Sequence, residues 1–282
     1  MLTSTVIRLQ ATNEGRLPLA MGEYGHAAFL GLVREVAPDL AQALHDAGTR
    51  KPFTVSPLQG QMQRHRQEWR IRAGADCWIR FTILDPALYA VFSRYFAETL
   101  TFNLELHLGE IQLVVEEVTT TQGKWSGYTT FPQLLAGASD DPVIPLRFHS
   151  LTAFSLGDLD GVGPRTGMFP EPELVFDSLL TKWNTFANEP LEAKPLRELL
   201  KDRCVVVKRY RLESDLWRFR RHLQPGFWGY CVYEIKGGDT EQRRYFNALA
   251  DFAFYAGVGY RTTMGMGQCQ RMPDKHDRVS QK

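Results

Sequence analysis

Hydrophobic and polar positions change their spacing several times along the first half of the chain. Residues 4–10 alternate in the manner of a half-buried strand, and residues 24–45 then place apolar side chains three and four positions apart. Pro38 falls inside this helical pattern, and because proline lacks the amide hydrogen that a helix interior needs, a kink or break is predicted there. The predicted helix has one buried face, formed by Phe29, Leu32, Val33, Val36, Leu40 and Leu44.

Further elements of the first half follow from short apolar runs bounded by turn residues. A helix is predicted to begin at Asp85 and Pro86. Strands are predicted at residues 52–58, 68–74, 77–84, 101–106 and 110–118. The resulting order of strand, helix, strands, helix and strand is typical of the split βαβ arrangement of a ferredoxin-like fold.

The second half repeats this order. Polar and Gly-rich residues favour a junction around residues 120–140, so we place the domains at residues 1–122 and 123–282. We therefore expect an α+β protein made of two tandem ferredoxin-like (RRM-like) βαββαβ domains. The second-half pattern predicts a strand at 145–154, a helix at 169–186, strands at 203–214 and 227–235, a helix at 240–255 and a strand at 267–272.

Composition limits the classes of function without choosing among them. The chain has 282 residues, of which 44% are hydrophobic and 23% are charged, and its net charge is +1. Its apolar runs are far shorter than the roughly 20 residues that cross a bilayer. Its first residues lack the layout of a signal peptide, so a cytoplasmic location without membrane contact is expected. No metal, disulfide framework or cofactor is expected, and the scattered cysteines are interpreted as buried thiols: Cys77, Cys204, Cys231 and Cys269.

Local charge indicates a nucleic-acid partner more clearly than the net charge does. Residues 50–72 and residues 201–222 are both rich in arginine and lysine, with aromatic residues between the basic ones. Basic side chains suit contact with phosphates, and aromatic rings suit stacking against bases. A solvated hairpin face is the alternative interpretation of either stretch taken alone.

A glycine-rich segment near the C-terminus, residues 252–269, lies between a predicted helix and a predicted strand. A dinucleotide-binding fingerprint would run from a strand into a helix and would have glycine where Thr262 stands. A P-loop would have lysine after Gly265, where this chain has Met266. Two interpretations remain: a loop whose backbone approaches a ligand closely, and a series of tight turns.

The same segment, as helix–G-x-G-x-x-T-x-x-G-x-G–strand, resembles the signature loop of the CRISPR-associated, RNA-processing endoribonucleases of the RAMP superfamily. Residues 30–58 also resemble this family, whose first helix runs into a loop with a catalytic histidine before a PFT-like strand. Similar segments at residues 126–135, 147–154, 169–184 and 224–235 extend the resemblance over nearly the whole chain.

The resemblance implies a role for particular residues. The family's catalytic histidine falls on His45 and the basic residue before the PFT strand falls on Lys51. Some members place a tyrosine in the first helix, where this chain has Leu30, so His45 is expected to carry most of the proton transfer. His26, at the start of the same helix, is the alternative general acid or base.

The activity that the resemblance implies is metal-independent cleavage of CRISPR precursor RNA. The ribose 2′-hydroxyl attacks the adjacent phosphate and leaves a 2′,3′-cyclic phosphate and a 5′-hydroxyl, and histidine suits the proton transfer because its pKa lies near neutrality. The expected partners are CRISPR repeat RNA or crRNA, other CRISPR effector-complex subunits and a second copy of the chain. The expected RNA-binding residues are Gly257, Gly259, Arg261, Thr262, Thr263, Gly265, Gly267, Lys208, Arg209, Arg218, Arg220 and Arg221.

Two alternatives remain open at this point. The first is a protein of the same fold that holds processed RNA in an effector complex without cutting it, which the absence of the helix tyrosine favours. The second is a ferredoxin-like protein that binds a small nucleotide or a metal at the glycine-rich loop. RNA affinity that falls steeply with salt distinguishes both RNA-binding interpretations from the second alternative.

Overall fold

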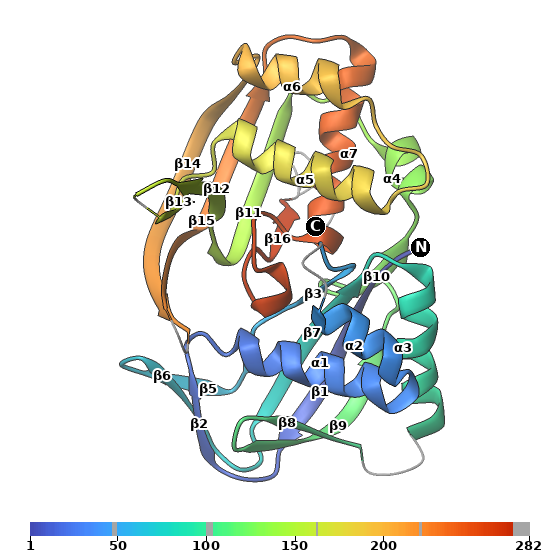
Figure 1. Cartoon of the computed structure of the whole chain (residues 1–282), viewed down its shortest axis with the longest axis vertical. Helices are drawn as coiled ribbons and strands as arrows, with labels where there is room; N and C mark the ends of the chain where they lie inside the picture. Colours follow the sequence, from blue (N-terminus) through green and yellow to red (C-terminus); the bar gives the residue numbers. More distant parts are fainter. Residues whose placement is uncertain (47–49, 100–103, 162, 220–221, 273–282) are drawn as a thin grey trace, which may run out of the picture. The chain divides into compact units, whose positions relative to one another are not determined.

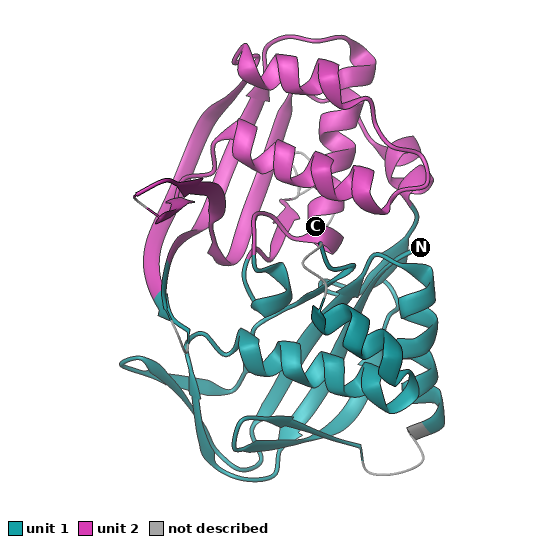
Figure 2. Cartoon of the chain, viewed as in Figure 1, with its two compact units in different colours: residues 1–130, 217–224, 261–266 teal, residues 131–216, 225–260, 267–282 magenta. Residues whose placement is uncertain are grey.

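The computed structural model describes residues 1–46, 50–99, 104–161, 163–219 and 222–272 (Figure 1). The chain forms two compact units (Figure 2). Unit 1 comprises Met1–Thr130, Trp217–Gln224 and Arg261–Met266, and unit 2 comprises Phe131–Leu216, Pro225–Tyr260 and Gly267–Lys282. Unit 1 therefore includes two short segments that come from the second half of the sequence.

Unit 1 is built on an antiparallel sheet with the order β3-β7-β1-β9-β8, and Figure 1 shows helices α1, α2 and α3 on one face of it. Strands β3, β7, β1 and β9 follow the ferredoxin-like order. The strand after the first helical segment, β3, lies at the edge beside β7, and the last strand of the unit's βαββαβ order, β9, pairs with β1. Their bounds are β1 Leu2–Ala11, β3 Phe53–Val55, β7 Asp76–Ile83, β8 Glu105–Leu108, β9 Ile111–Thr119, α1 Gly22–Val36, α2 Pro38–Asp46 and α3 Pro86–Thr99; β4 Gln59–Gly60 pairs with β7, and β10 Gly127–Thr129 pairs with β1.

The break predicted at Pro38 is confirmed. Helix α1 ends at Val36, and α2 begins at Pro38, a position where the missing amide hydrogen costs nothing. The inner face of α1 packs into the core through Phe29, whose ring lies 4.2 Å from that of Phe53 and 5.6 Å from that of Phe92. The apolar spacing of the sequence therefore reports the packing of this helix correctly.

A second, smaller sheet in unit 1 has the order β2-β6-β5. Only β6 (Glu68–Ile71) was predicted, whereas β2 (Gly15–Pro18) and β5 (Met62–His65) were not. The two missed strands are only four residues long: β5 is mostly exposed, and β2 has Leu17 as its one buried residue, so neither shows the alternation that marks a half-buried strand. The sequence therefore predicts no element at either of these two strands.

Unit 2 repeats the topology with the sheet β14-β15-β11-β16, and Figure 1 shows α5 and α7 covering one face. Helix α7 begins with a capping box between Asp239 and Gln242 and ends at Gly257, as predicted. The bounds are β11 Val143–Thr152, α5 Pro172–Phe186, β14 Val205–Arg218, β15 Leu223–Ile235, α7 Thr240–Ala256 and β16 Cys269–Arg271, with the unpredicted α4 Phe131–Gly137, β12 Phe154–Leu159, β13 Gly163–Gly167 and α6 Ala193–Lys201. The two ferredoxin-like topologies confirm the predicted fold class.

Two smaller expectations concern cysteines and membranes. All four cysteines are free thiols; Cys77, Cys231 and Cys269 are buried as predicted, whereas Cys204 is partly exposed. Cys204 lies beside Gly237, which has no side chain to cover it. In the part of the chain that the structure describes, no helix is long and apolar enough to span a bilayer.

Candidate active site

His26 lies in the first part of helix α1 and is almost fully buried, with 9% of its surface exposed. Its ring stacks on Phe53 at 5.6 Å, and its Nδ1 lies 3.2 Å from the carbonyl oxygen of Thr263. Because a carbonyl oxygen can only accept, Nδ1 must carry the proton and donate it. In the neutral ring this leaves the Nε2 lone pair available as an acceptor.

The surroundings of His26 keep it neutral. The pKa of His26 is lowered from 6.5 to about 4, chiefly by burial; nearby Lys51 and His45 contribute to the lowering, and the hydrogen bond to Thr263 opposes it. Charged forms are disfavoured both by removal from water and by like charges in the neighbourhood. His26 is therefore a neutral imidazole at physiological pH.

His45 occupies the last turn of α2, and its side chain is exposed. The Lys51 Nζ donates to the backbone carbonyl of His45 at 3.3 Å. Lys51 is half-buried, and its pKa is lowered by burial, which the nearby Asp46 opposes. Because both His45 and Lys51 act on the pKa of His26, unit 1 brings the three predicted catalytic residues close together. Leu30, at the position where some family members have tyrosine, is buried.

The glycine-rich loop (residues 257–267) contacts this site through its central part. Thr262–Met264 form a short 3-10 helix, and its end packs against the start of α1 so closely that a Cβ atom at Gly22 would overlap the Met264 carbonyl. Gly265 has φ of 83° and Arg261 has φ of 56°, so the loop makes two left-handed turns around this 3-10 helix. These are the tight turns of one of the two interpretations left open by the sequence, and they direct the Thr263 carbonyl to His26.

The tip of the β14–β15 hairpin (Trp217–Gln224) belongs to the same unit and anchors the loop. The Arg261 guanidinium lies 5.3 Å from the centre of the Phe219 ring, which is buried and stacks on His222 at 5.2 Å with an angle of 5°. Burial lowers the pKa of His222, Arg261 lowers it further, and Glu23 opposes them. Sequence reasoning missed Phe219 as an anchor, although a large apolar residue inside a basic stretch was a usable signal.

The other predicted RNA-binding residues have different environments. Lys208 is paired with Glu234 at 3.1 Å, and the Arg209 guanidinium lies 5.7 Å from the Tyr230 ring centre, all within unit 2. Arg218 is exposed at the hairpin tip in unit 1. The remaining members of the set divide as follows: Thr262, Thr263 and Gly265 in unit 1; Gly257, Gly259 and Gly267 in unit 2; and Arg220 and Arg221 outside the described residues.

Two family models match the chain, and together they cover most of it. The model described as "CRISPR Cas6 N-terminal domain" matches residues 1–136, and the model described as "CRISPR-associated endoribonuclease Cas6" matches residues 146–269. Among curated proteins, the CRISPR-associated endoribonuclease Cas6 of Streptococcus thermophilus is 31% identical over 101 residues, which are 36% of this chain and 41% of the relative. The Mycobacterium tuberculosis protein of the same name is 29% identical over 106 residues, 37% of this chain and 33% of the relative. The matched segments thus span less than half of these curated relatives.

Solved structures match over a much larger share of the chain. A Cas6 protein in a product complex is 29% identical with a TM-score of 0.80, covering 96% of this chain and 100% of that one. Cas6 of Thermus thermophilus is 27% identical with a TM-score of 0.72, covering 96% and 98%. A third structure, of a Cas6 protein in a substrate mimic complex, is 29% identical with a TM-score of 0.71, covering 96% of this chain and 99% of that one.

Proposed function

The chain belongs to the Cas6 family of CRISPR-associated endoribonucleases, and from this premise we propose that it binds CRISPR repeat RNA and cleaves the precursor without a metal. The observation that carries the proposal is the cluster of His26, His45 and Lys51 beside the Thr263 carbonyl. It combines an exposed imidazole, a buried neutral imidazole and an ammonium group within one unit. This combination suits proton transfer and charge stabilisation at a phosphate.

The reaction needs no external nucleophile. The 2′-oxygen bonds to phosphorus as its proton leaves to a base, and the bond between phosphorus and the 5′-oxygen breaks as that oxygen gains a proton. The products are a 2′,3′-cyclic phosphate and a 5′-hydroxyl, and no water is consumed. We assign the proton transfer to His45, because its exposed ring is accessible to RNA, whereas the ring of His26 is largely buried against Phe53 and the loop.

Lys51 and His26 have supporting roles in this proposal. The Lys51 ammonium stabilises the extra negative charge on the pentacoordinate phosphate, a contribution of about 3 kcal/mol in preorganised sites. Its contact with the His45 carbonyl also links the cation to the end of α2. His26 keeps the glycine-rich loop against α1 and is the alternative general base through Nε2.

We assign RNA binding to basic and loop residues in each of the two units. Arg261 and Arg218 in unit 1, together with Lys208 and Arg209 in unit 2, supply cations for phosphates. Arg220 and Arg221 belong to the same proposal from sequence alone. Phosphate contacts supply affinity, and unpaired bases supply the sequence-specific contacts in RNA recognition.

The test is cleavage of a cognate repeat RNA in EDTA. We expect wild-type protein to cut and His45→Ala to be slower by about 10²- to 10⁴-fold, the usual contribution of a general acid or base. His107→Ala is the matched control, because His107 is an exposed histidine on β8. A substrate with a 2′-deoxyribose at the scissile position must bind and remain uncut. Equal rates for His45→Ala and His107→Ala would overturn the assignment of His45.

A second candidate function is favoured by one residue. Leu30 is buried where some family members place a tyrosine, so a three-residue mechanism is incomplete in this chain. A protein that holds crRNA without cutting it is consistent with this difference. Wild-type protein that binds the repeat tightly but yields no product in single-turnover assays would favour this second candidate.

A further inference from the structure

The small sheet β2-β6-β5 carries a polar row on one face. Its register places Arg16 opposite Arg70, and Arg70 opposite Gln63. The neighbouring row contains Leu17, which is buried, and side chains alternate between the faces of a sheet. Arg16, Arg70 and Gln63 therefore share the outer face, and all three are exposed.

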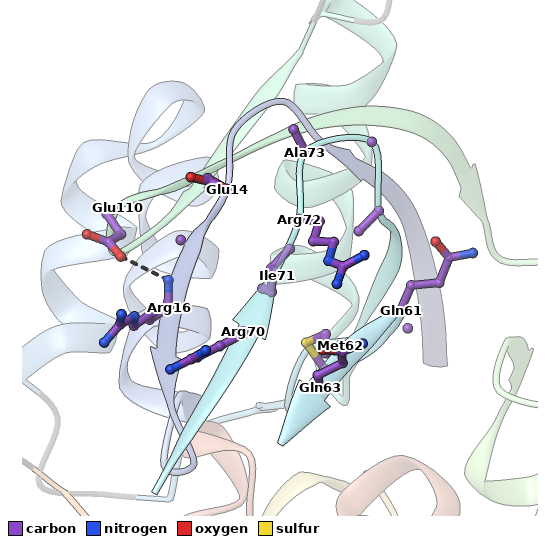
Figure 3. Close-up of a pocket in the computed structure, with 14 residues that line it drawn as sticks. Glu14, Arg16, Gln61, Met62, Gln63, Arg70, Ile71, Arg72, Ala73 and Glu110 are labelled. Carbon is purple, nitrogen blue, oxygen red and sulfur yellow. Dashed lines mark hydrogen bonds between the residues drawn. The ribbon is translucent and has the colours of Figure 1, made fainter. Parts of the chain in front are cut away.

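This face borders a cavity of about 760 Å³ that lies wholly within unit 1 (Figure 3). The end of β6 continues into residues 72–75, which form one wall with Arg72 and the backbone of Gly74. Gly74 has φ of 79° and faces open space, so the wall consists of backbone there. Met62 and Ile71 also line the cavity, but their row lies on the opposite face of the small sheet and packs against the core of unit 1. Cavities of this size hold ligands as large as a nucleotide.

Three arginines and two glutamates, Glu14 and Glu110, line the cavity, so its lining carries an excess of one positive charge. Like charges directly opposite on neighbouring strands destabilise a sheet, and Arg16 and Arg70 occupy such positions. The Arg16 guanidinium is 3.6 Å from Glu68, and Arg70 Nη2 is 3.4 Å from His65 Nδ1. Glu110, also in the lining, already accepts from the Arg16 backbone amide at 2.9 Å.

Two long polar side chains at the cavity have unused bonding capacity. Among the residues that the structure describes, Arg72 and Gln63 form no side-chain hydrogen bond or ion pair. Gln61 differs, because its amide exchanges two bonds of 3.3 Å with Asp76. The free guanidinium and the free amide thus remain available to a ligand that has both an anionic group and hydrogen-bonding edges.

We propose that this cavity is a second RNA site, which binds one unpaired nucleotide and its phosphodiester. The arginines contact the phosphodiester, and the amide of Gln63 contacts the edge of the base. The inference rests on the proposed RNA substrate, but the cavity shares no residue with the cluster of His26, His45 and Lys51. It adds affinity for a segment of the repeat away from the scissile phosphate.

The test compares RNA binding by R70A/R72A with binding by wild type and by Arg94→Ala. Each phosphate contact with single-stranded RNA contributes about 0.7 to the slope of log affinity against log salt, so losing two contacts lowers the slope by about 1.4. At about 0.1 M salt this corresponds to about 25-fold weaker binding. Arg94→Ala removes a surface arginine paired with Glu98 on α3 and must leave affinity unchanged.

Two further measurements separate this inference from the proposed function. R70A/R72A must cut saturating repeat RNA at the wild-type single-turnover rate, whereas His45→Ala must bind normally and cut about 10²- to 10⁴-fold more slowly. Titration with an unstructured oligouridine tests the cavity even if the repeat is never cleaved. If R70A/R72A binds both RNAs with wild-type affinity and an unchanged salt slope, the second site does not exist.

Discussion

The two units share one strand order, but they use their helices differently. In both units a helix of 15 residues is followed by one of nine residues, α1 and α2 in unit 1 and α5 (Pro172–Phe186) and α6 in unit 2. The buried side of α5 is apolar, with residues such as Phe176 and Leu179, whereas the buried side of α1 includes His26. The same topology therefore buries only apolar side chains on α5, whereas on α1 it also buries an ionisable one.

Each unit also uses a lysine at a helix end, with different geometry. Lys182 donates to the carbonyls of Ala256 and Gly257 at 3.1 and 2.9 Å and caps α7. Lys51 has a single longer bond of 3.3 Å to the His45 carbonyl at the end of α2. An ammonium group has three donors, so Lys51 keeps bonding capacity for a phosphate, while Lys182 is committed to structure.

Replacing each lysine with alanine should give the largest effects, on cleavage rate for Lys51 and on stability for Lys182. Lys51→Ala should lower the single-turnover cleavage rate by about 10²- to 10³-fold, as loss of a preorganised charge does, with little change in stability. Lys182→Ala should leave two carbonyls without their donor and cost about 1–3 kcal/mol of unfolding free energy. Cleavage rates and urea denaturation of both variants check this. Equal effects on rate would mean that Lys51 is also structural.

The titration of His26 is the next largest expected effect. Its folded pKa of about 4 lies below the unfolded value of 6.5, so the unfolded chain binds more protons between these pH values. The free energy of unfolding should therefore fall as pH drops from 6.5 toward 4, by about 3 kcal/mol. The side of α5 that faces the sheet has no such group, so this loss should originate in unit 1.

The variant that checks the titration is His26→Asn, whose amide retains a donor for Thr263 but does not titrate. Urea denaturation from pH 7 to pH 4 should show a shallower loss of stability than in wild type. His107→Asn, at an exposed histidine, should follow the wild-type curve. If His26→Asn and wild type lose stability in parallel, His26 is not the group that resists protonation.

Features of the fold and the site that depend on local spacing can be predicted from the sequence, whereas those that depend on distant partners cannot. The break at Pro38 and the burial of Phe29 follow from local spacing, and His26 could have been placed on the buried face because it precedes Phe29 by three positions. The contact of Thr263 with His26 joins residues 237 positions apart, so no local pattern reports it. The β2 and β5 strands depend on pairing with β6 and have almost no apolar signal of their own.

The smallest expected effects come from the glycines of α1, a residue type that α5 lacks entirely. Gly22 lies against the Met264 carbonyl, so Gly22→Ala should cost about 1–3 kcal/mol of unfolding free energy through overpacking. It should also slow cleavage, because the displaced 3-10 helix carries the Thr263 carbonyl away from His26. Gly31→Ala is the matched control, since nothing lies within 4 Å of its added methyl group. Alanine is the better helix former there, so stability should rise by about 0.5–1 kcal/mol with an unchanged cleavage rate. Urea denaturation and single-turnover assays of the two variants measure both quantities. If Gly22→Ala matched Gly31→Ala in stability and rate, close packing of the loop on α1 would not be what distinguishes this unit from the other.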